Sequence, residues 1–336
     1  MSLPLLSFSS KALRPAVGFD AYHALYATGA DVTRTDGAFH AEVRAYRFNR
    51  MLVFERRLAG VGHDRDVARV RRDGFDHLTL HLLLSGSLVA GAEGEERRLR
   101  PGEILVIDTS APQRNRCDDT HTITVAVARD QIGTLIPDPR AFHGTVLSQR
   151  VAGVIADLMI SFTHRVEALT PDTSDQFGPV LGMLLAAALK GTPPGAEAVA
   201  ALGQPDGGRR RKVEAFIEAH LSDHGLDADA IAGGVGISRT VLYRCFAADG
   251  GVARFIQLRR LERIRNVLRR RGGAHPLAAI AHAHGFSSEQ HLNRAFRSTF
   301  GRPPGQFRSM IEQLRRAKDP GDGRTQPLND WLIELY

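Results

Sequence analysis

The sequence predicts an α+β protein in which an antiparallel β-barrel with flanking helices precedes an all-α domain. Three observations lead to this expectation: short alternating apolar runs between about 39 and 128, helical apolar spacing from about 209 to 318, and a linker-like stretch between them. The chain has 336 residues, which fits two domains at roughly 100–200 residues each.

The barrel is predicted from apolar residues that alternate in short runs, each bounded by Gly, Pro, Asp or Asn. In the first run, 39–48, apolar residues recur at positions 39, 41, 43 and 45. Gly91–Gly94 is typical of a hairpin turn, and Pro101-Gly102 of a tight turn. The later runs are Met51–Arg57, His77–Leu84, Ser87–Ala90, Arg97–Leu99, Glu103–Ile107 and Thr120–Val127.

Between about 145 and 190 the apolar period changes from two to about 3.6, which indicates two helices. They form either a layer packed on the barrel or a seam between two copies of the chain. The residues with this spacing are Val146, Val151, Val154, Ile155, Leu158 and Met159, then Phe177, Val180, Leu181, Leu184 and Leu185.

Domain boundaries follow from composition. Residues 191–208, GTPPGAEAVAALGQPDGG, are typical of a linker. They separate an expected domain at 1–190 from a helical domain at 209–318. The tail 319–336 starts as a Pro/Gly stretch and ends in the apolar WLIELY.

The charge is divided unevenly between these parts. Residues 209–318 carry 21 Lys+Arg and 9 Asp+Glu, a net charge of +12, while the remainder carries −5, so that the chain totals +7. A basic third of this kind indicates a polyanion partner, most often nucleic acid, although a solvated arginine-rich surface is the alternative.

Other classes are disfavoured by simple features. Two cysteines, Cys117 and Cys245, build neither a disulfide framework nor a four-cysteine zinc site. No apolar run approaches the ~20 residues of a membrane span. The first ten residues do not have the pattern of a secretory signal. We therefore expect a cytoplasmic protein without a cofactor.

The basic third contains an internal repeat with the spacing of a helix-turn-helix unit. Its first copy ends in Leu242-x-Arg244-x-Phe246, and its second ends 50 residues later. A small Ala lets two helices cross closely, a Gly four residues later permits the turn, and Leu and Phe bury one face of the second helix. The repeated positions are Ala232, Gly236, Leu242, Arg244 and Phe246, then Ala281, Gly285, Leu292, Arg294 and Phe296.

An amphipathic helix is expected between the two copies, with apolar positions at Phe255, Leu258, Leu261, Ile264 and Leu268. It would hold the two units at a fixed separation. Both second helices could then enter successive major-groove segments, about 34 Å apart, on one face of DNA.

Residues in and after the second repeat match a family signature. Gly285-Phe286, Leu292-x-Arg294-x-Phe296 and Phe300-Gly301-x-x-Pro304-x-x-Phe307-Arg308 together resemble the signature of the AraC/XylS family of transcription regulators. The similarity covers about 209–310. Leu82–Gly86 and Leu99–Asp108 more weakly resemble the cupin-like sensor barrel of these regulators, and the opening around Phe8 and Ser9 resembles their catabolic branch.

The resemblance implies a DNA-binding regulator, expected to be an effector-responsive activator of catabolic genes. The implied partners are double-stranded DNA, a small-molecule effector and a second copy of the chain, with RNA polymerase as a further candidate. One departure concerns Gly233-Gly234, two poor helix formers at the end of the first helix of the first unit, which put its fit in doubt.

The candidate DNA-contacting residues occupy exposed positions of the second helix in each unit. Arg can read guanine, Gln and Asn can read adenine, and Glu can accept from cytosine, but contacts to phosphate or a solvated face are the alternatives. Arg244 and Arg294 could instead be structural arginines with buried stems. Arg209–Lys212 either grips phosphates or is solvated. The candidates are Arg239, Thr240, Tyr243, Arg244, Ser288, Glu289, Gln290, Asn293 and Arg294.

An effector pocket is expected in the mouth of the barrel, lined by inward residues of the strands. Tyr46 has the opposite parity to Phe39 and Val43, so it faces inward only if its strand bulges. The candidates are Phe39, Val43, Tyr46, Phe54, His81 and Leu83.

A metal site is not expected. His77 and His81 share one face of a strand, but the histidine and carboxylate set of a metal-binding cupin is incomplete. The two histidines could line the pocket or face solvent. The alternative function is a cupin-type metalloenzyme with an accessory DNA-binding domain, but no catalytic triad or phosphate-binding glycine loop supports an enzyme.

Overall fold

The computed structural model describes residues 5–26, 29–48, 50–73, 75–132, 135–136, 139–169, 176–190, 207–247, 250–271 and 275–316, with Trp331 and Leu335. The chain forms two compact units. The first comprises 1–198 together with 323–336, and the second comprises 199–322. The chain therefore leaves the first unit once and returns to it at its C-terminal end.

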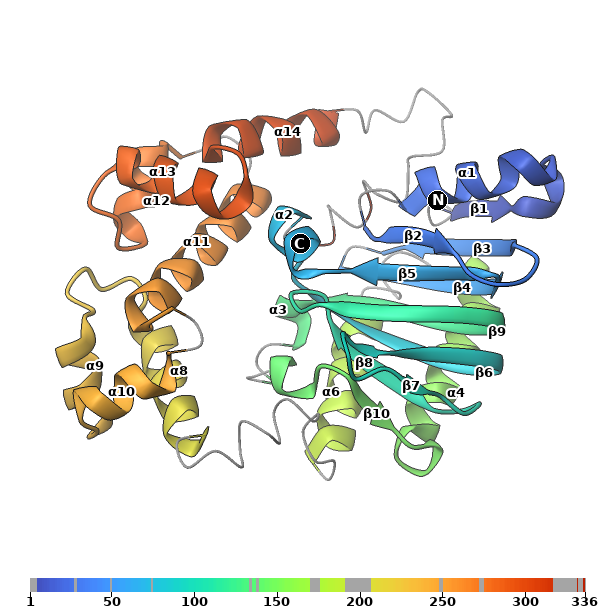
Figure 1. Cartoon of the computed structure of the whole chain (residues 1–336), viewed down its shortest axis with the longest axis horizontal. Helices are drawn as coiled ribbons and strands as arrows, with labels where there is room; N and C mark the ends of the chain where they lie inside the picture. The colour runs from blue at the N-terminus through green and yellow to red at the C-terminus, as the bar shows by residue number, and fades with distance from the viewer. Residues whose placement is uncertain are drawn as a thin grey trace. The chain divides into compact units, whose positions relative to one another are not determined.

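The first unit is built on one ten-stranded antiparallel sheet (Figure 1). Its main order is β1-β3-β4-β9-β6-β8-β10, while β5 joins β2 to β9, and β7 pairs with β6. The strands are β1 (Leu5–Ser9), β2 (Asp31–Arg34), β3 (His40–Arg47), β4 (Met51–Ala59), β5 (Val61–Arg65), β6 (His77–Ala92), β7 (Arg97–Arg98), β8 (Ile104–Asp108), β9 (Gln113–Ala128) and β10 (Thr145–Leu147).

The two longest strands, β6 and β9, are antiparallel neighbours, and both bend at the same level of their shared ladder. Gly86 in β6 and Asp119 in β9 both have positive φ, +85° and +46°, and the ladder between them is irregular from Leu83 to Ser87. A Cβ on Gly86 would lie 1.8 Å from the Asp119 carbonyl oxygen, so only glycine fits. This bend lets β9 pair with β5 along its first part and with β4 along its second, which curls the sheet.

The curled sheet has an apolar core on each face. The inner face packs with Tyr22 and Tyr26 of α1, and the outer face is covered by α4 and α6. The helices of this unit are α1 (Pro15–Tyr26), α2 (Val67–Asp73), α3 (Arg129–Ile132), α4 (Gln149–Arg165) and α6 (Phe177–Lys190), with short 3₁₀ turns at Ser10–Ala12, Pro139–Phe142 and Val166–Ala168.

The structure differs from the sequence prediction in some details. The two runs 77–84 and 87–90 form one bent strand, β6. Val146 lies in β10, because it pairs with Leu105 of β8 before α4 begins. Val151 and Val154 of α4 are exposed, so the buried stripe of this helix runs through Ala152, Ile155 and Met159 instead.

The C-terminal segment takes part in the first unit. Trp331 and Leu335 are 3% and 2% exposed and belong to the apolar cluster on the inner face of the sheet. These two residues of the expected tail thus belong to that core.

The second unit consists of helices only, among its described residues. Two helix pairs, α9–α10 and α12–α13, lie at either end of the long helix α11 (Figure 1). The helices are α8 (Gly207–His220), α9 (Ala228–Val235), α10 (Arg239–Cys245), α11 (Val252–Arg271), α12 (Leu277–Ala283), α13 (Glu289–Phe300) and α14 (Pro304–Arg316). Gly207 and Gly208, expected in the linker, lie in α8, and residues 191–206 fall outside the described ranges.

Local signals explain the two turns. Gly236 and Gly285 have φ of +72° and +78°, the left-handed conformation that favours glycine. The hydroxyl of Ser238 accepts a hydrogen bond from the Val241 amide at 3.3 Å, and Ser288 accepts one from His291 at 3.1 Å. Each second helix therefore starts at a serine N-cap two or three residues after its glycine.

The glycine pair of the first unit has a packing role. A Cβ on Gly234 would lie 2.3 Å from two ring carbons of Phe216 in α8, whereas a Cβ on Gly233 would meet nothing within 4 Å. Gly234 therefore lets α8 and α9 approach closely. The departure at this position is a requirement of the local packing.

Candidate DNA-binding helices and effector cavity

The surface of α10 presents the four residues expected to contact DNA in the first unit. Arg239, Thr240, Tyr243 and Arg244 are all exposed, while Leu242 and Cys245 are buried on the opposite face. Arg239 is held in place: it donates to the Tyr243 hydroxyl at 2.9 Å, lies over that ring, and pairs with Asp229 at 3.2 Å. The helix thus offers a fixed basic and aromatic surface.

The surface of α13 presents the corresponding residues of the second unit. Ser288, Gln290 and Arg294 are exposed, and Glu289 and Asn293 are half-buried. Leu292, Phe296 and Phe300 form the buried face, as the repeat predicts for the first two. Ser288 already spends its hydroxyl on the helix cap, so it is a positioning residue as well as a candidate contact.

The basic cluster at 209–212 includes a structural arginine. Arg210 donates to the Cys245 carbonyl oxygen at 2.7 Å, pairs with Glu214, and lies 4.7 Å from the centre of the Phe246 ring. This guanidinium joins α8 to the end of α10 and is occupied inside the unit.

The first unit contains a cavity of about 100 Å³ inside the curled sheet. It is lined by strands β4, β5, β6 and β9, the end of α1 and the segments around Phe75 and Thr109. The lining residues are Tyr26, Gly29, Ala30, Phe54, Arg56, His63, Arg65, Phe75, His77, Thr79, His81, Thr109, Gln113, Asn115, Thr124 and Ala126.

Arg56 and His81 meet at this cavity. Arg56 Nη2 donates to the Thr124 hydroxyl and lies 3.4 Å from His81 Nδ1, and His81 Nε2 lies 3.0 Å from the Thr79 hydroxyl. Burial and the nearby Arg56 lower the pKa of His81 to about 3. The imidazole is therefore neutral at neutral pH and can accept from the arginine.

His63 forms a second chain of hydrogen bonds on the cavity wall. Its Nε2 lies 2.8 Å from the Tyr22 hydroxyl and its Nδ1 lies 2.8 Å from Asn115 Oδ1. An amide oxygen only accepts, so Nδ1 carries the proton and Nε2 accepts from the tyrosine. Burial and Arg56 lower the pKa of His63 to about 4, which keeps this arrangement neutral.

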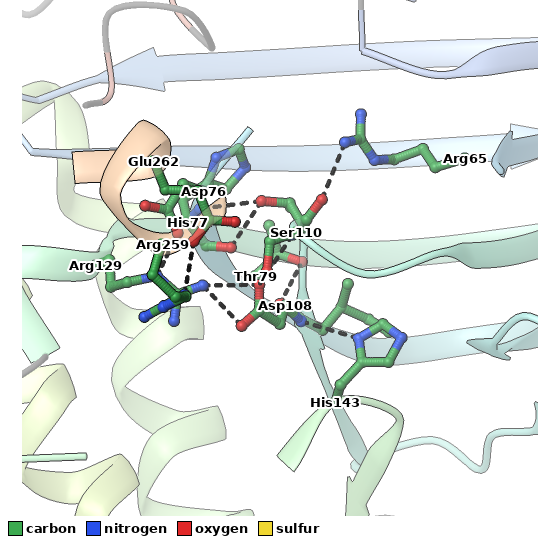
Figure 2. Close-up of polar contacts among 12 residues, drawn as sticks. Arg65, Asp76, His77, Thr79, Asp108, Ser110, Arg129, His143, Arg259 and Glu262 are labelled. Atoms are coloured by element: carbon green, nitrogen blue, oxygen red, sulfur yellow. Dashed lines mark hydrogen bonds and ion pairs between the residues drawn. The ribbon is translucent and has the colours of Figure 1, made fainter. Parts of the chain in front are cut away.

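One end of the cavity rests on a charged network, seen in Figure 2 around Asp108. Arg129 pairs with Asp76 and donates to both carboxylate oxygens of Asp108, at 2.8 and 2.7 Å. Burial opposes ionisation of Asp108, but Arg129 outweighs it and holds the pKa of this carboxyl well below its usual range. The network fixes the loop that carries Thr109.

Thr109 connects this network to the cavity. Its hydroxyl and its amide both donate to the carbonyl oxygen of His77, at 2.8 and 3.0 Å, and its own carbonyl oxygen accepts from Arg65 at 3.0 Å. Burial and Arg65 lower the pKa of His77 to about 3. His77 and His81 both line the cavity, which is one of the two positions that the sequence left open for them.

The six candidate pocket residues divide into three groups. Phe54 and His81 line the cavity. Phe39, Val43 and Leu83 pack in or against the inner core and do not line it, because rings of α1 cover that part of the sheet. Tyr46 lies in the outer core, since β3 keeps its alternation without a bulge.

Sequence reasoning missed the polar residues of the cavity, above all Arg56, His63, Arg65 and Thr124. A signal for Arg56 was present: in β4 it falls between Phe54 and Leu58 on the inward side, where alternation requires an apolar residue. Asn115 and Arg65 lie in segments with many polar residues, so the apolar alternation that predicts a strand is absent there.

Among the described residues, no three His, Cys, Asp or Glu side chains lie close enough together to bind a metal ion. Cys117 and Cys245 are both buried and unpaired with each other. No described helix has the length and apolarity that crossing a membrane requires.

Comparison with known proteins agrees with this architecture. A helix-turn-helix domain family matches residues 231–310, and an AraC-binding-like domain family matches residues 22–190, half of the chain. The sequence is 24% identical over 253 residues to the transcriptional activator NphR of a Rhodococcus species, covering 73% of each chain.

Among solved structures, the chain resembles the AraC-like transcriptional activator CuxR, with 22% identity, a TM-score of 0.54, and coverage of 77% of this chain and 94% of that one. A DNA-binding regulator from Chromobacterium violaceum is 29% identical over 32% of this chain and 96% of its own, with a TM-score of 0.29. With an effector-binding type of barrel ahead of two helix-turn-helix units, and both family models matched, the chain belongs to the AraC/XylS family of transcription regulators.

Proposed function

We propose that this regulator is an effector-responsive activator of catabolic genes, acting in the cytoplasm as a homodimer. Residues 1–190 sense the effector and dimerise, 191–206 link the domains, and the helical unit from α8 to α14 contacts DNA. The likeness to a transcriptional activator supports the sign of regulation, and for an activator we propose RNA polymerase as a further partner. The observation that carries the DNA-binding role is the paired exposure of Arg244 and Arg294 at equivalent positions of α10 and α13.

DNA recognition follows from the exposed faces of the two helices. Arg239, Thr240, Tyr243 and Arg244 would contact one major-groove segment, with Arg244 reading guanine or holding phosphate. Ser288, Glu289, Gln290, Asn293 and Arg294 would contact the next segment. The exposure of Arg244 and Arg294 supports a contact role over the structural alternative considered from the sequence.

The test is a gel-shift titration of the full-length protein with the DNA upstream of its gene, at graded salt. The double variant Arg244→Ala with Arg294→Ala is expected to lose at least tenfold in affinity, because each arginine contact is worth about 1–3 kcal/mol. The salt dependence should also weaken if either arginine binds phosphate.

The matched control removes the same charge elsewhere. Arg97 and Arg98 are exposed in β7 of the other unit. Their double alanine variant is expected to bind DNA as the wild type does. Equal affinity of the Arg244/Arg294 variant and this control would refute the residue assignment.

Dimerisation is proposed through the outer surface of α4 and α6. Val151 and Val154 on α4, and Val180 and Met183 on α6, are exposed apolar side chains, each pair three residues apart on its helix. Analytical ultracentrifugation of a Val154→Asp variant tests this: a shift from dimer to monomer supports the seam, and an unchanged dimer excludes it.

A non-enzymatic role is part of the proposal. The alternative, a cupin-type metalloenzyme, needs a ligand cluster, and the described residues provide none. Elemental analysis of the purified protein checks this, since the enzyme alternative requires a metal at near-unit stoichiometry.

A further inference from the structure

We propose that the effector is a small organic monocarboxylate whose charged end binds Arg56 and the Tyr26 hydroxyl, and whose ring-sized apolar part fills the cavity beside Phe54 and Phe75. This inference rests on the proposed function, because it names the chemical class of the molecule sensed there. It follows from the position of one arginine, the charge of the cavity wall, two buried donors side by side and the size of the cavity.

Arg56 occupies a place that ordinary barrel packing gives to an apolar residue. It follows Leu52 and Phe54 and precedes Leu58 on the inward side of β4, and those three belong to the inner core. Burying a cation without a compensating charge is costly. A residue that breaks the core pattern in this way marks a functional position rather than a packing one.

The wall around Arg56 supplies no negative charge. None of the described residues that line the cavity is Asp or Glu. The titratable groups with the largest electrostatic influence on Arg56 are Tyr26, Tyr22 and Cys117, and none of them is a carboxylate. Arg65 adds a second guanidinium to the same wall, and His63, His77 and His81 stay neutral there.

At this wall, the buried Nε of Arg56 and the buried hydroxyl of Tyr26 have no hydrogen bond of ordinary geometry, and both residues line the cavity. Arg56 Nη2 contacts Thr124 and His81, and the Tyr26 hydroxyl interacts with the same guanidinium, so Nε and this hydroxyl lie together and can bind one anion. A carboxylate has two oxygens and only accepts, which matches two donors of this kind.

The rest of the ligand is apolar and small. Phe54, Phe75, Ala30 and Ala126 line the cavity together with the polar groups. Its volume of about 100 Å³ is about two thirds of the ~150 Å³ cavity that holds a benzene-sized molecule, so the apolar part of the ligand is at most a single ring. A cationic ligand would face two guanidinium groups.

The experiment is isothermal titration calorimetry of the full-length protein with benzoate and phenylacetate, compared with benzamide, benzylamine and inorganic phosphate. At least one carboxylate is expected to bind, and the amide, the amine and phosphate to bind at least tenfold more weakly. Replacing Arg56 with Met is expected to weaken carboxylate binding about ten- to hundred-fold, the range of a charge-assisted hydrogen bond.

Two further variants keep the result interpretable. Arg57→Met removes the same charge from the neighbouring exposed position of β4 and is expected to bind as the wild type does. Arg56→Lys retains a cation and is expected to bind more tightly than Arg56→Met. Circular dichroism establishes that each variant is folded, and if Arg56→Met does not fold, the Arg56→Lys and Tyr26→Phe variants carry the test.

The proposal is overturned if neither carboxylate binds at millimolar concentration, if benzamide or benzylamine binds as tightly, or if binding survives in Arg56→Met. Gel shifts on the same preparations separate this from the proposed function. If the wild-type protein does not bind DNA, the proposed function as a regulator is wrong. If it binds DNA but no carboxylate, only the proposed ligand class is wrong.

Discussion

The guanidinium of Arg260 donates a hydrogen bond of 2.9 Å to the carbonyl oxygen of Gly285, the residue at which α12 turns into α13. The same side chain donates to the carbonyl oxygens of Leu221 and Asp223, which follow α8 in the other half of the unit. One arginine of α11 therefore ties the turn of the second helix-turn-helix to the first.

Replacing Arg260 with Met is expected to lower the free energy of unfolding of the second unit by about 1–3 kcal/mol, because three backbone carbonyls lose their charged donor. DNA affinity should fall as well, because Arg260 would no longer fix the turn before α13 relative to the first helix-turn-helix unit. Thermal unfolding and gel shifts measure the two effects. Arg254→Met, at an exposed position of the same helix, is the control and should change neither.

The two adjacent glycines of α9 are expected to respond in opposite directions to alanine. Gly234→Ala places a Cβ against the Phe216 ring and should destabilise the unit by about 1–3 kcal/mol. Gly233→Ala meets open space and should stabilise the helix by up to about 1 kcal/mol. Denaturant unfolding compares them, and a Phe216→Leu partner should relieve the first variant. Equal effects at both positions would contradict the packing role of Gly234.

The helical unit was predictable from sequence because its signals are local. Each turn has a glycine with positive φ, a serine cap and an apolar face within about fifteen residues, as Gly285, Ser288 and Leu292 show. The barrel was predictable as a class for a similar reason. What local pattern could not show was pairing: β5 carries His63, Asp64 and Arg65, and becomes a strand only because β2 and β9 flank it.

The cavity was harder to predict than either domain. Its residues come from α1 and four strands that are distant in sequence, so only the closed sheet brings Tyr26, Arg56 and His81 to one wall. Phe39 and Val43 have the inward parity that the pocket required, yet α1 packs over that region, and a helix position of this kind leaves no trace in the strand pattern.

The first unit is expected to lose stability as the pH falls from about 7 to about 5. His63 and His81 have pKa values of about 4 and about 3 when folded, below the ordinary 6.5, so between these values only the unfolded chain takes up protons. Stability is therefore full above 6.5 and declines below it, by up to about 2 kcal/mol for each histidine by about pH 5.

Urea unfolding of the first unit at several pH values measures how its free energy of unfolding depends on pH. A His63→Gln variant should show a shallower dependence than the wild type, because one group that binds protons only when unfolded is gone. The exposed His164 replaced by Gln is the control and should keep the wild-type slope. Parallel curves for His63→Gln and the wild type would contradict the assigned role of His63.

The single tryptophan of the chain reports on the return of the C-terminal segment to the first unit. Because Trp331 is buried with the inner core, its fluorescence should be poorly quenched by acrylamide in the folded full-length protein. Trp331→Ala is expected to lower the stability of the first unit by about 3–5 kcal/mol, the range for an aromatic side chain removed from a core. Leu5→Ala, at an exposed apolar position of the same unit, provides the control and should cost far less. Ready quenching of Trp331, together with equal stability of the two variants, would mean that the segment does not dock in solution. Strong protection would show that Trp331 packs in the core of the first unit in solution.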